Sequence, residues 1–330
     1  MKKIKIAING FGRLGRSIAR VIAMQEDMEL IAINDISSWE ILSYLLEHDS
    51  THHHFPKPIK FSDQELFINH KKVKTLNHSN PKDIDFSDAD IVIESSGKFL
   101  EQKDFLHHLE KGVKKVILSA PSNDDMPTFV LGVNHQNYND ENIISNASCT
   151  TNCLAPICYI LDKHFGINNG NIITIHSYTN DQNLLDHAHK NDKRRSRAAA
   201  NNIIPTSTGA AKNLYKVLPN LRNKLHGHSV RIPVSNVSLL DLNINLLKTP
   251  SLETLNSLFE EYATTSLKGI LSIDSHFGVS SDFLQNTHSS IIAKDLSFNI
   301  NNLVKIMAWY DNEWGYSNRI IELARYILNK

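Results

Sequence analysis

The chain has 330 residues, of which 41% are hydrophobic and 21% charged, a composition typical of a globular protein and not of a disordered one. This length is sufficient for two domains, each with its own core. Its 35 Lys and Arg residues balance 35 Asp and Glu residues, which removes any bulk electrostatic argument for nucleic acid or an anionic membrane as the main partner.

Cysteine content and the N-terminal sequence bear on the cellular compartment. Three cysteines in 330 residues argue against a disulfide scaffold and favour a reducing compartment. The first residues, Met1-Lys2-Lys3-Ile4, run directly into a short apolar segment that is too short for a signal peptide or a membrane span. We therefore expect a cytoplasmic protein.

The first elements in chain order form a strand–turn–helix–strand unit. Residues 3–9 are predicted to form a strand, and Gly10-Phe11-Gly12-Arg13-Leu14-Gly15 follows at once. A helix is predicted over residues 16–25, and a second buried strand over residues 29–35 ends in an acidic residue. A G-x-G-x-x-G motif in this setting predicts an α/β domain of the Rossmann type that binds a dinucleotide.

Each glycine of the motif has a physical role in that fold. Gly10 permits the tight turn, Gly12 lets the backbone approach a pyrophosphate, and Gly15 lets the helix pack against the strand. The pyrophosphate would meet the N-terminus of the helix. Asp35, about 20 residues after the last glycine, can accept hydrogen bonds from the ribose hydroxyls of NAD and would repel a 2′-phosphate. NAD is therefore the expected cofactor.

Two further apolar segments, residues 91–95 and 115–120, are predicted to continue the sheet. Small polar residues, Ser96, Gly97 and Ser119, lie at or beside the ends of these segments. In an open α/β sheet such strand ends form the cofactor crevice, so the three are candidate cofactor contacts. The alternative is that they only form the turns.

Cys149 lies where a buried strand gives way to a predicted amphipathic helix over residues 151–165. Free N–H groups and the helix dipole at that end favour negative charge, and they can lower a thiol pKa into roughly the 3.5–7.5 range. The hydroxyl residues Ser148 and Thr150 beside it suit an anion better than an apolar core. We interpret Cys149 as a nucleophile, with a buried structural cysteine as the alternative. Cys153 is interpreted as a packing residue, because a bridge to Cys149 within one helix would be strained.

The next strand is predicted over residues 171–175 and delivers His176 just beyond its end. A cysteine nucleophile needs a base, and His176 is the candidate. The basic segment 190–197 is either a solvated loop or a phosphate-binding one. A hydroxyl-rich turn at residues 204–212 leads into a helix, which suits an anion, and Arg231 interrupts a strand pattern, where a cation usually has an anionic partner.

His52-His53-His54 is the other conspicuous cluster, and it suggests a metal site. No cysteine or acid stands at ligand spacing around these histidines, so no metal is expected.

With these motifs assembled, the whole chain resembles the phosphorylating glyceraldehyde-3-phosphate dehydrogenases of glycolysis, bacterial type. The matching segments are residues 7–16, 148–153, 206–212 and 309–317. The resemblance implies an NAD-binding Rossmann domain over 1–148 plus a C-terminal helix at 313–330. It also implies an α+β catalytic domain with a mostly antiparallel sheet over 149–312.

The resemblance implies a covalent mechanism. Cys149 attacks the aldehyde to give a thiohemiacetal, with His176 as base and later as acid. Hydride transfer to the nicotinamide leaves a thioester, and inorganic phosphate displaces the acyl group as an acyl phosphate.

Site residues carry over from the family to matching positions. Thr179 and Arg231 correspond to the site of the substrate phosphate. The site of the attacking phosphate maps onto Ser148, Thr150, Arg195, Thr208 and Gly209. Cofactor contacts map onto Arg13, Leu14, Asp35, Ser119 and Asn312. The family also implies a homotetramer in which the loop around residues 178–200 packs against a neighbouring subunit.

Departures from the family pattern leave alternatives open. Residues 177–182 resemble bacterial members that include NADP-using anabolic forms and erythrose-4-phosphate dehydrogenase, whereas the turn at 206–212 is of the glyceraldehyde-3-phosphate type. Ser37 and Ser38 could bind the 2′-phosphate of NADP if Asp35 turned away. A binding or adhesion protein that has lost catalysis is the alternative from another class. His53 replaces a glycine usual in the family.

Overall fold

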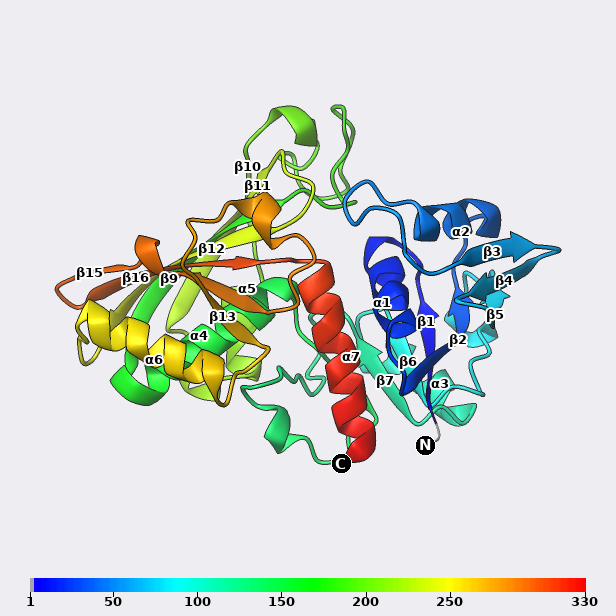
Figure 1. The fold of residues 1–330 in the computed structure, drawn as a ribbon, viewed down its shortest axis with the longest axis horizontal. Helices are drawn as coiled ribbons and strands as arrows, with labels where there is room; N and C mark the ends of the chain where they lie inside the picture. The colour runs from blue at the N-terminus through cyan, green and yellow to red at the C-terminus, as the bar shows by residue number, and fades with distance from the viewer. Residues whose placement is uncertain (1–2) are drawn as a thin grey trace. The chain divides into compact units, whose positions relative to one another are not determined.

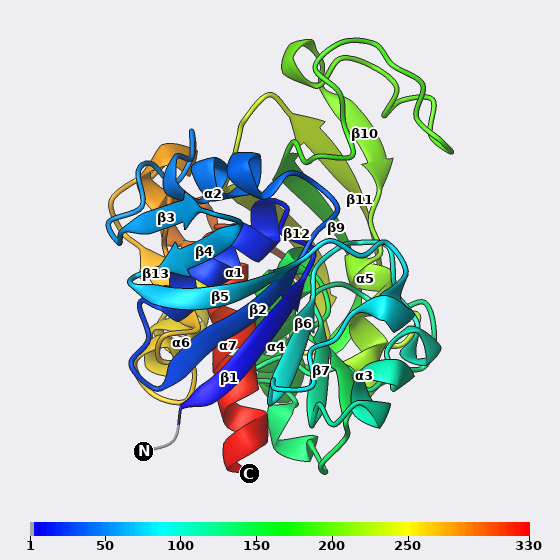
Figure 2. The ribbon, with the colours of Figure 1, turned by 90° about the vertical axis from the view of Figure 1, so that its right-hand side faces the viewer.

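The computed structural model describes residues 3–330 and contains two compact units. Of the described residues, 3–129, 136–147 and 317–330 form the first unit, and 130–135 and 148–316 form the second. Figures 1 and 2 show their helices and strands, and each unit is described by itself.

The first unit is built on an eight-stranded sheet in the order β3-β4-β5-β2-β1-β6-β7-β8. These strands are β1 (Ile4–Asn9), β2 (Met28–Asn34), β3 (Ile59–Ser62), β4 (Glu65–Ile68), β5 (Lys71–Leu76), β6 (Ile91–Glu94), β7 (Lys115–Leu118) and β8 (Ile143–Ser145). The strands from β5 to β8 in this order are parallel, and β3-β4-β5 is an antiparallel extension. Figure 2 shows β5, β2, β1, β6 and β7 side by side. This is the predicted Rossmann-type sheet.

Three helices of this unit are α1 (Arg13–Ala23), α2 (Trp39–Glu47) and α3 (Leu106–Glu110). The strands β6 and β7 are buried at every position, as expected for parallel strands covered on both faces. The helix α1 begins three residues earlier than predicted, because helical backbone already starts within the glycine motif.

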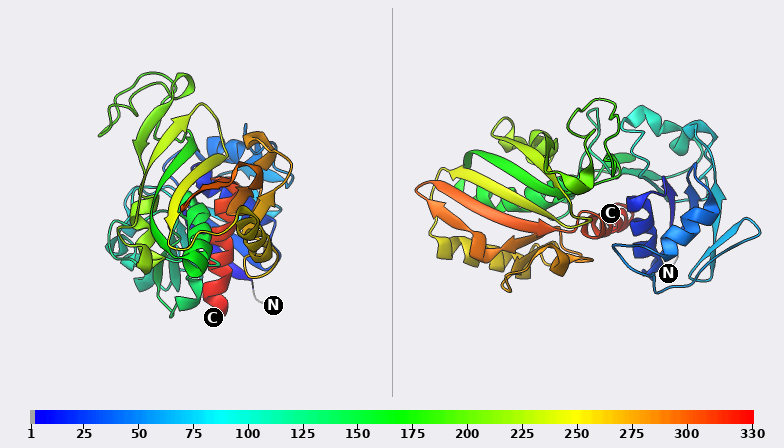
Figure 3. Two further views of the ribbon diagram at one scale, coloured as in Figure 1. Left: turned by 90° about the vertical axis from the view of Figure 1, so that its left-hand side faces the viewer. Right: turned by 90° about the horizontal axis from the view of Figure 1, so that it is seen from above.

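The second unit has a mostly antiparallel sheet in the order β10-β11-β9-β12-β16-β14-β13, with β15 paired to β16. Its strands are β9 (Ile167–Ser177), β10 (Ile204–Ser207), β11 (Leu225–Ile232), β12 (Ser238–Leu246), β13 (Leu271–Asp274), β14 (Ser290–Ala293), β15 (Phe298–Ile300) and β16 (Leu303–Tyr310). Only β11 with β9 and β13 with β14 pair in parallel. Figure 3 shows these strands from two further directions.

Helix α4 (Cys149–Phe165) packs on this sheet against β9, β12, β14 and β16, while α6 (Leu252–Thr264) packs on β13. The short α5 (Ala210–Asn213) lies beside β11. Buried and half-buried residues alternate along β12 and β16, so one face of the sheet supplies the core. The fold class predicted from the sequence, a Rossmann-type unit and an α+β unit, is confirmed.

The last helix, α7 (Trp314–Asn329), begins in the second unit and continues into the first. Within the first unit, Arg325 near its end donates to both carboxylate oxygens of Asp27 at 2.6 and 2.9 Å. The described residues 3–330 contain no helix with the length and hydropathy needed to cross a membrane.

Candidate active site

Cys149 is the first residue of α4, because this helix begins two residues earlier than predicted. Ser148 caps the helix, since its Oγ accepts a hydrogen bond from Thr151 N at 3.0 Å. Ala147, directly before the cap, has a φ of +55°, a left-handed conformation that turns the chain sharply between β8 and α4. This turn and cap place the half-buried residue Cys149 at the helix N-terminus.

The Sγ atom of Cys149 lies 3.7 Å from Nε2 of His176. His176 is the penultimate residue of β9, inside the strand and not beyond its end as predicted, and it is 5% exposed. The two residues predicted as nucleophile and base therefore meet, although 27 positions separate them in the sequence. At this distance a hydrogen bond to sulfur can form, as a nucleophile and its base require.

Burial sets the charge state of this pair. Burial raises the pKa of Cys149 despite the nearby charge of Arg231, which lowers it. Burial and Arg231 together lower the pKa of His176 to about 3. Burial therefore opposes the thiolate that the helix N-terminus favours, and it favours the neutral forms of both side chains. The neutral imidazole can accept a proton from the thiol as the sulfur attacks.

Arg231 lies on β11 directly opposite His176 on β9. Its Nη1 is 2.7 Å from His176 Nδ1 and donates to Ser177 O at 3.0 Å. Its buried Nε atom has no hydrogen-bond partner among the described residues. A buried guanidinium with a free donor fits an anionic ligand.

Tyr310, the last residue of β16, contacts the residues around Cys149 and His176. Its hydroxyl lies 2.9 Å from Thr150 Oγ1 and 2.7 Å from Thr174 Oγ1, and its ring meets His176 edge to face. Burial raises the pKa of Tyr310, so the hydroxyl stays protonated. The hydroxyl of Thr150 is thus already engaged, and the sequence did not reveal this contact.

Asn312 follows β16 and is held by two hydroxyl groups. Ser177 Oγ and Ser238 Oγ donate to its Oδ1 at 2.9 and 2.8 Å. These bonds fix the orientation of the amide and use only its carbonyl oxygen.

Arg195 and Thr179 meet at a carboxylate that the sequence did not single out. Asp181 accepts from Arg195 Nη1 at 2.8 Å and from the hydroxyl of Thr179. Arg195 Nε also donates to Thr206 Oγ1 at 2.9 Å. Thr206 lies at the end of β10, just before Thr208 and Gly209 at the start of α5. The loop therefore brings Thr179 and Arg195 together at Asp181 and holds Arg195 against the strand that precedes Thr208.

In the first unit, the glycine motif has the geometry that a dinucleotide requires. A Cβ on Gly10 would lie 2.4 Å from Ser96 N, and one on Gly15 would lie 2.1 Å from Gly10 O, so neither position admits a side chain. A Cβ on Gly12 would meet nothing within 4 Å, which leaves its backbone open to a ligand. These residues fit a pyrophosphate on the N-terminus of α1.

Asp35 is positioned beside the same turn. Its Oδ2 accepts from Phe11 N at 2.7 Å and its Oδ1 from Ser37 N at 2.9 Å. Oδ2 is thus held at the glycine turn, while Oδ1 is held by the turn that follows β2. Arg13, another candidate cofactor contact at this turn, forms an ion pair with Asp49 at 2.6 Å.

Ser96 and Ser119 are linked through Glu94, a buried acid at the end of β6. Ser96 N and Oγ donate to the Glu94 carboxylate at 2.8 and 2.5 Å, and Ser119 Oγ donates to Glu94 O at 2.7 Å. Asn9 Nδ2 donates to the same carboxylate at 2.6 Å. Burial raises the pKa of Glu94 to about 7. Gly97 follows with a φ of +70°.

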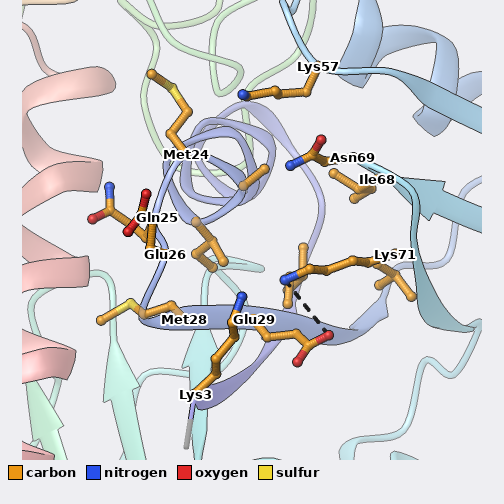
Figure 4. A pocket seen from close by; sticks show the side chains of 14 residues that line it. Lys3, Met24, Gln25, Glu26, Met28, Glu29, Lys57, Ile68, Asn69 and Lys71 are labelled. Carbon is orange, nitrogen blue, oxygen red and sulfur yellow. Dashed lines mark ion pairs between the residues drawn. The ribbon is translucent and has the colours of Figure 1, made fainter. Parts of the chain in front are cut away.

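A cavity of about 460 Å³ lies at the other end of the same strands (Figure 4). It is lined by Lys3, Met24, Glu29 and Lys71 among others, near the N-termini of β1 and β2. None of the site residues predicted from the sequence is among those described as lining it. This cavity is therefore separate from the glycine turn.

Comparison with known proteins decides the family. The family model described as the glyceraldehyde 3-phosphate dehydrogenase C-terminal domain matches residues 148–312, and the one described as its NAD binding domain matches residues 4–102. This chain belongs to the glyceraldehyde-3-phosphate dehydrogenase family.

Relatives of this family match over nearly their whole length. A glyceraldehyde-3-phosphate dehydrogenase of Helicobacter pylori is 52% identical, covering 98% of this chain and 99% of the relative. The glyceraldehyde-3-phosphate dehydrogenase 1 of Bacillus cereus is 45% identical and the glyceraldehyde-3-phosphate dehydrogenase of Geobacillus stearothermophilus 44% identical, each match covering 99% of both chains. The recognition drawn from the sequence motifs is confirmed, and with it an oxidoreductase of this family that uses NAD.

The sequence patterns of this glyceraldehyde-3-phosphate dehydrogenase family member do not identify three polar residues of the site. Tyr310 lies inside the motif at residues 309–317, but nothing in that pattern predicts its contacts. Asp181 stands within the departing segment 177–182, and an acid between Thr179 and an arginine-rich loop was the available signal. Glu94 ends an apolar strand, and that position alone could have identified it.

Proposed function

We propose that this protein catalyses the phosphorylating oxidation of D-glyceraldehyde 3-phosphate to 1,3-bisphosphoglycerate in glycolysis and gluconeogenesis. The observation that carries the proposal is the contact of 3.7 Å between Cys149 Sγ and His176 Nε2, with the guanidinium of Arg231 beside the ring. A neutral thiol and a neutral imidazole at this distance suit a nucleophile and its base.

Cys149 Sγ bonds to the aldehyde carbon as its proton passes to His176 Nε2, and the aldehyde oxygen then takes that proton to complete the thiohemiacetal. In the oxidation, His176 takes the hydroxyl proton while the hydride leaves the same carbon, which gives the thioester. NAD, when bound, supplies the acceptor for that hydride. An oxygen of inorganic phosphate then bonds to the acyl carbon and the carbon–sulfur bond breaks. The departing Cys149 thiolate takes the proton held on His176, and the proton of the phosphate is released to water.

The surroundings of His176 Nδ1 support both roles of the ring. Nδ1 lies 2.7 Å from Ser177 O and 2.7 Å from Arg231 Nη1. In one tautomer Nδ1–H donates a hydrogen bond to Ser177 O, which leaves Nε2 free to accept the thiol proton. In the other tautomer Nδ1 accepts a hydrogen bond from Arg231, which requires the ring proton to be on Nε2. An anion that draws Arg231 away from Nδ1 thus favours the base form.

Two phosphate subsites follow the family pattern. The substrate phosphate binds Thr179 and Arg231, and the unpartnered Nε of buried Arg231 supports this assignment. The attacking phosphate binds at Ser148, Thr150, Arg195, Thr208 and Gly209. The hydrogen bond of Arg195 Nε to Thr206 Oγ1 supports this second subsite, because it holds the guanidinium near the turn into α5.

The NAD-binding domain comprises residues 1–148 with the C-terminal helix at 313–330, and residues 149–312 form the catalytic domain. Cofactor contacts are assigned to Gly10, Gly12, Arg13, Leu14, Gly15, Asp35, Ser96, Gly97, Ser119 and Asn312. The open backbone at Gly12 and the two held oxygens of Asp35 support NAD over NADP.

The active form is a homotetramer, with the loop around residues 178–200 at a subunit contact. Leu184, Leu185 and Ile203 in and next to this loop are 72%, 79% and 72% exposed, an apolar surface that a neighbouring subunit would cover. The loop extends away from the strands it joins (Figures 1 and 2). The three free cysteines support a reducing, cytoplasmic location.

Steady-state kinetics test the proposal. NADH formation from glyceraldehyde 3-phosphate should depend strongly on inorganic phosphate, with NADPH formation slower and erythrose 4-phosphate the poorer substrate by kcat/KM. Activity indifferent to phosphate would contradict the thioester route. A preference for erythrose 4-phosphate or for NADP would overturn the assignment of substrate or cofactor.

A further inference from the structure

A second group of chemistry-bearing side chains lies at the end of α2 and in the loop that follows it. Glu47, His48 and His54 each offer a ligand atom, and these atoms all lie within 4.8 Å of one another. His48 Nε2 is 3.6 Å from Glu47 Oε2, and the centroids of the two imidazole rings are 5.2 Å apart. The sequence showed no acid at ligand spacing near His52-His53-His54, but the fold brings Glu47 to His54.

Hydrogen bonds from two buried residues, Phe55 and Arg20, hold the backbone of this loop. Phe55, which is buried, donates its N–H to Glu47 O at 2.8 Å, and this bond closes the loop next to its first and last ligands. The guanidinium of Arg20, 2% exposed, donates to Leu46 O at 2.6 and 2.9 Å and to His53 O at 3.0 Å. One buried cation therefore holds both sides of the loop.

Asp49 braces the loop from within. Its Oδ1 accepts from Thr51 N and His52 N, both at 2.8 Å, and its Oδ2 pairs with Arg13. By contrast, the side chains of His48 and His54 are exposed and Glu47 is half-buried. The ligand atoms are thus accessible to an ion while the backbone that carries them is fixed, which lowers the entropy that binding must overcome.

Two imidazoles and one carboxylate are a ligand set for divalent transition metals, with the fourth position of a tetrahedron left to water. Ligand bonds of about 2.0–2.2 Å place tetrahedral ligand atoms roughly 3.4 Å apart, close to the separation of His48 and Glu47. Rotation of the exposed side chain of His54 can bring its ring nitrogen to the same distance from the other two ligand atoms. We propose that Glu47, His48 and His54 bind one Zn²⁺ ion per chain, at a site outside the reaction chemistry.

His53 provides a matched control on the same loop. It is exposed, lies outside the cluster, and has a φ of +60°, the left-handed conformation that favours glycine. His53→Gly therefore removes a neighbouring histidine without removing a ligand, and it relieves backbone strain.

The test is titration with Zn²⁺ of untagged, full-length protein, by calorimetry and by competition with a chromogenic chelator. Cys149 is first alkylated with iodoacetamide so that the catalytic thiol cannot bind the ion. We expect one site per chain, weakened more than about tenfold in His48→Ala, His54→Ala and Glu47→Gln and unchanged in His53→Gly, since even partners of metal ligands contribute 10–100-fold. Thermal unfolding in chelator checks that each variant folds.

No saturable binding to the alkylated protein would overturn the proposal, as would equal weakening in His53→Gly. Phosphate-dependent NADH formation by the His48→Ala and His54→Ala proteins in chelator should match the parent protein, so failure of this site and failure of the enzymatic function are distinguishable.

Discussion

In the first unit, the dinucleotide cradle is formed largely by backbone of one short segment, Gly10 to Gly15, with Asp35 and Glu94 behind it. In the second unit, the catalytic site gathers side chains from α4, β9, β11 and β16 that are distant in sequence. A backbone site is sensitive to any added atom, whereas a side-chain site is sensitive to the loss of a functional group. The two units therefore call for opposite kinds of mutation.

The largest effect is expected in the second unit, from His176→Asn. Loss of the base should lower kcat by about 10²–10⁴-fold, because general base catalysis contributes that much, while KM for NAD stays within about twofold. Steady-state kinetics measure both. Thr174→Val is the control: it removes one hydrogen-bond partner of Tyr310 and should lower kcat far less than His176→Asn does. Equal losses in the two variants would contradict the role of His176.

Gly10→Ala and Gly12→Ala sharpen the account of the cradle. An added Cβ at Gly10 meets Ser96 N at 2.4 Å and requires a φ of +91°, so we expect a loss of unfolding free energy of about 3 kcal/mol or more. The Cβ at Gly12 meets nothing within 4 Å, so that variant should keep its stability and instead bind NAD more weakly. Chemical denaturation and NAD titration separate the two. Equal stability of both variants would contradict the packing account.

Glu94 makes the stability of the first unit depend on pH. Its pKa of about 7 in the folded protein lies above that of an exposed glutamate, about 4.5, so the folded state binds the extra proton. This contribution is fully present below pH 4.5 and is lost as the pH rises toward 7, by about 3 kcal/mol at 1.36 kcal/mol per pKa unit. Glu94→Gln should remove that slope from denaturation curves measured between pH 4.5 and 7.5. An unchanged slope would show that Glu94 does not carry the extra proton.

The smallest expected effect is at Asp181, whose carboxylate pairs with Arg195 and accepts from Thr179. Asp181→Asn frees the guanidinium and removes a negative charge beside it, so KM for phosphate should fall about threefold, in line with the small free energy of exposed ion pairs. Phosphate titrations at saturating aldehyde measure this change. A rise in KM would mean that Asp181 positions Arg195 for phosphate and does not compete with it.

The dinucleotide cradle could be predicted from sequence because its residues are contiguous and local backbone geometry requires its glycines. The Cys149 and His176 pair could be proposed from local patterns, since each stands at the junction of a strand and a polar segment. Their contact could not, because it depends on how α4 packs on β9.

Other features were out of reach for the same reason. The raised pKa of Cys149 follows from burial, which the helix N-terminus alone does not reveal. Tyr310 reaches Thr150 across 160 residues, and Asp181 meets Arg195 only once the loop folds. The approach of Glu47 to His54 likewise depends on the brace formed by Arg20.

The central claim, a covalent intermediate on Cys149, is tested most directly by mixing the protein with NAD and glyceraldehyde 3-phosphate in the absence of phosphate. We predict a burst of one NADH per chain and an acyl adduct on the peptide that contains Cys149, seen by mass spectrometry and released on addition of phosphate. Cys149→Ser should show neither. Continuous NADH formation by the parent protein with no adduct, or a burst that survives in Cys149→Ser, would contradict the account.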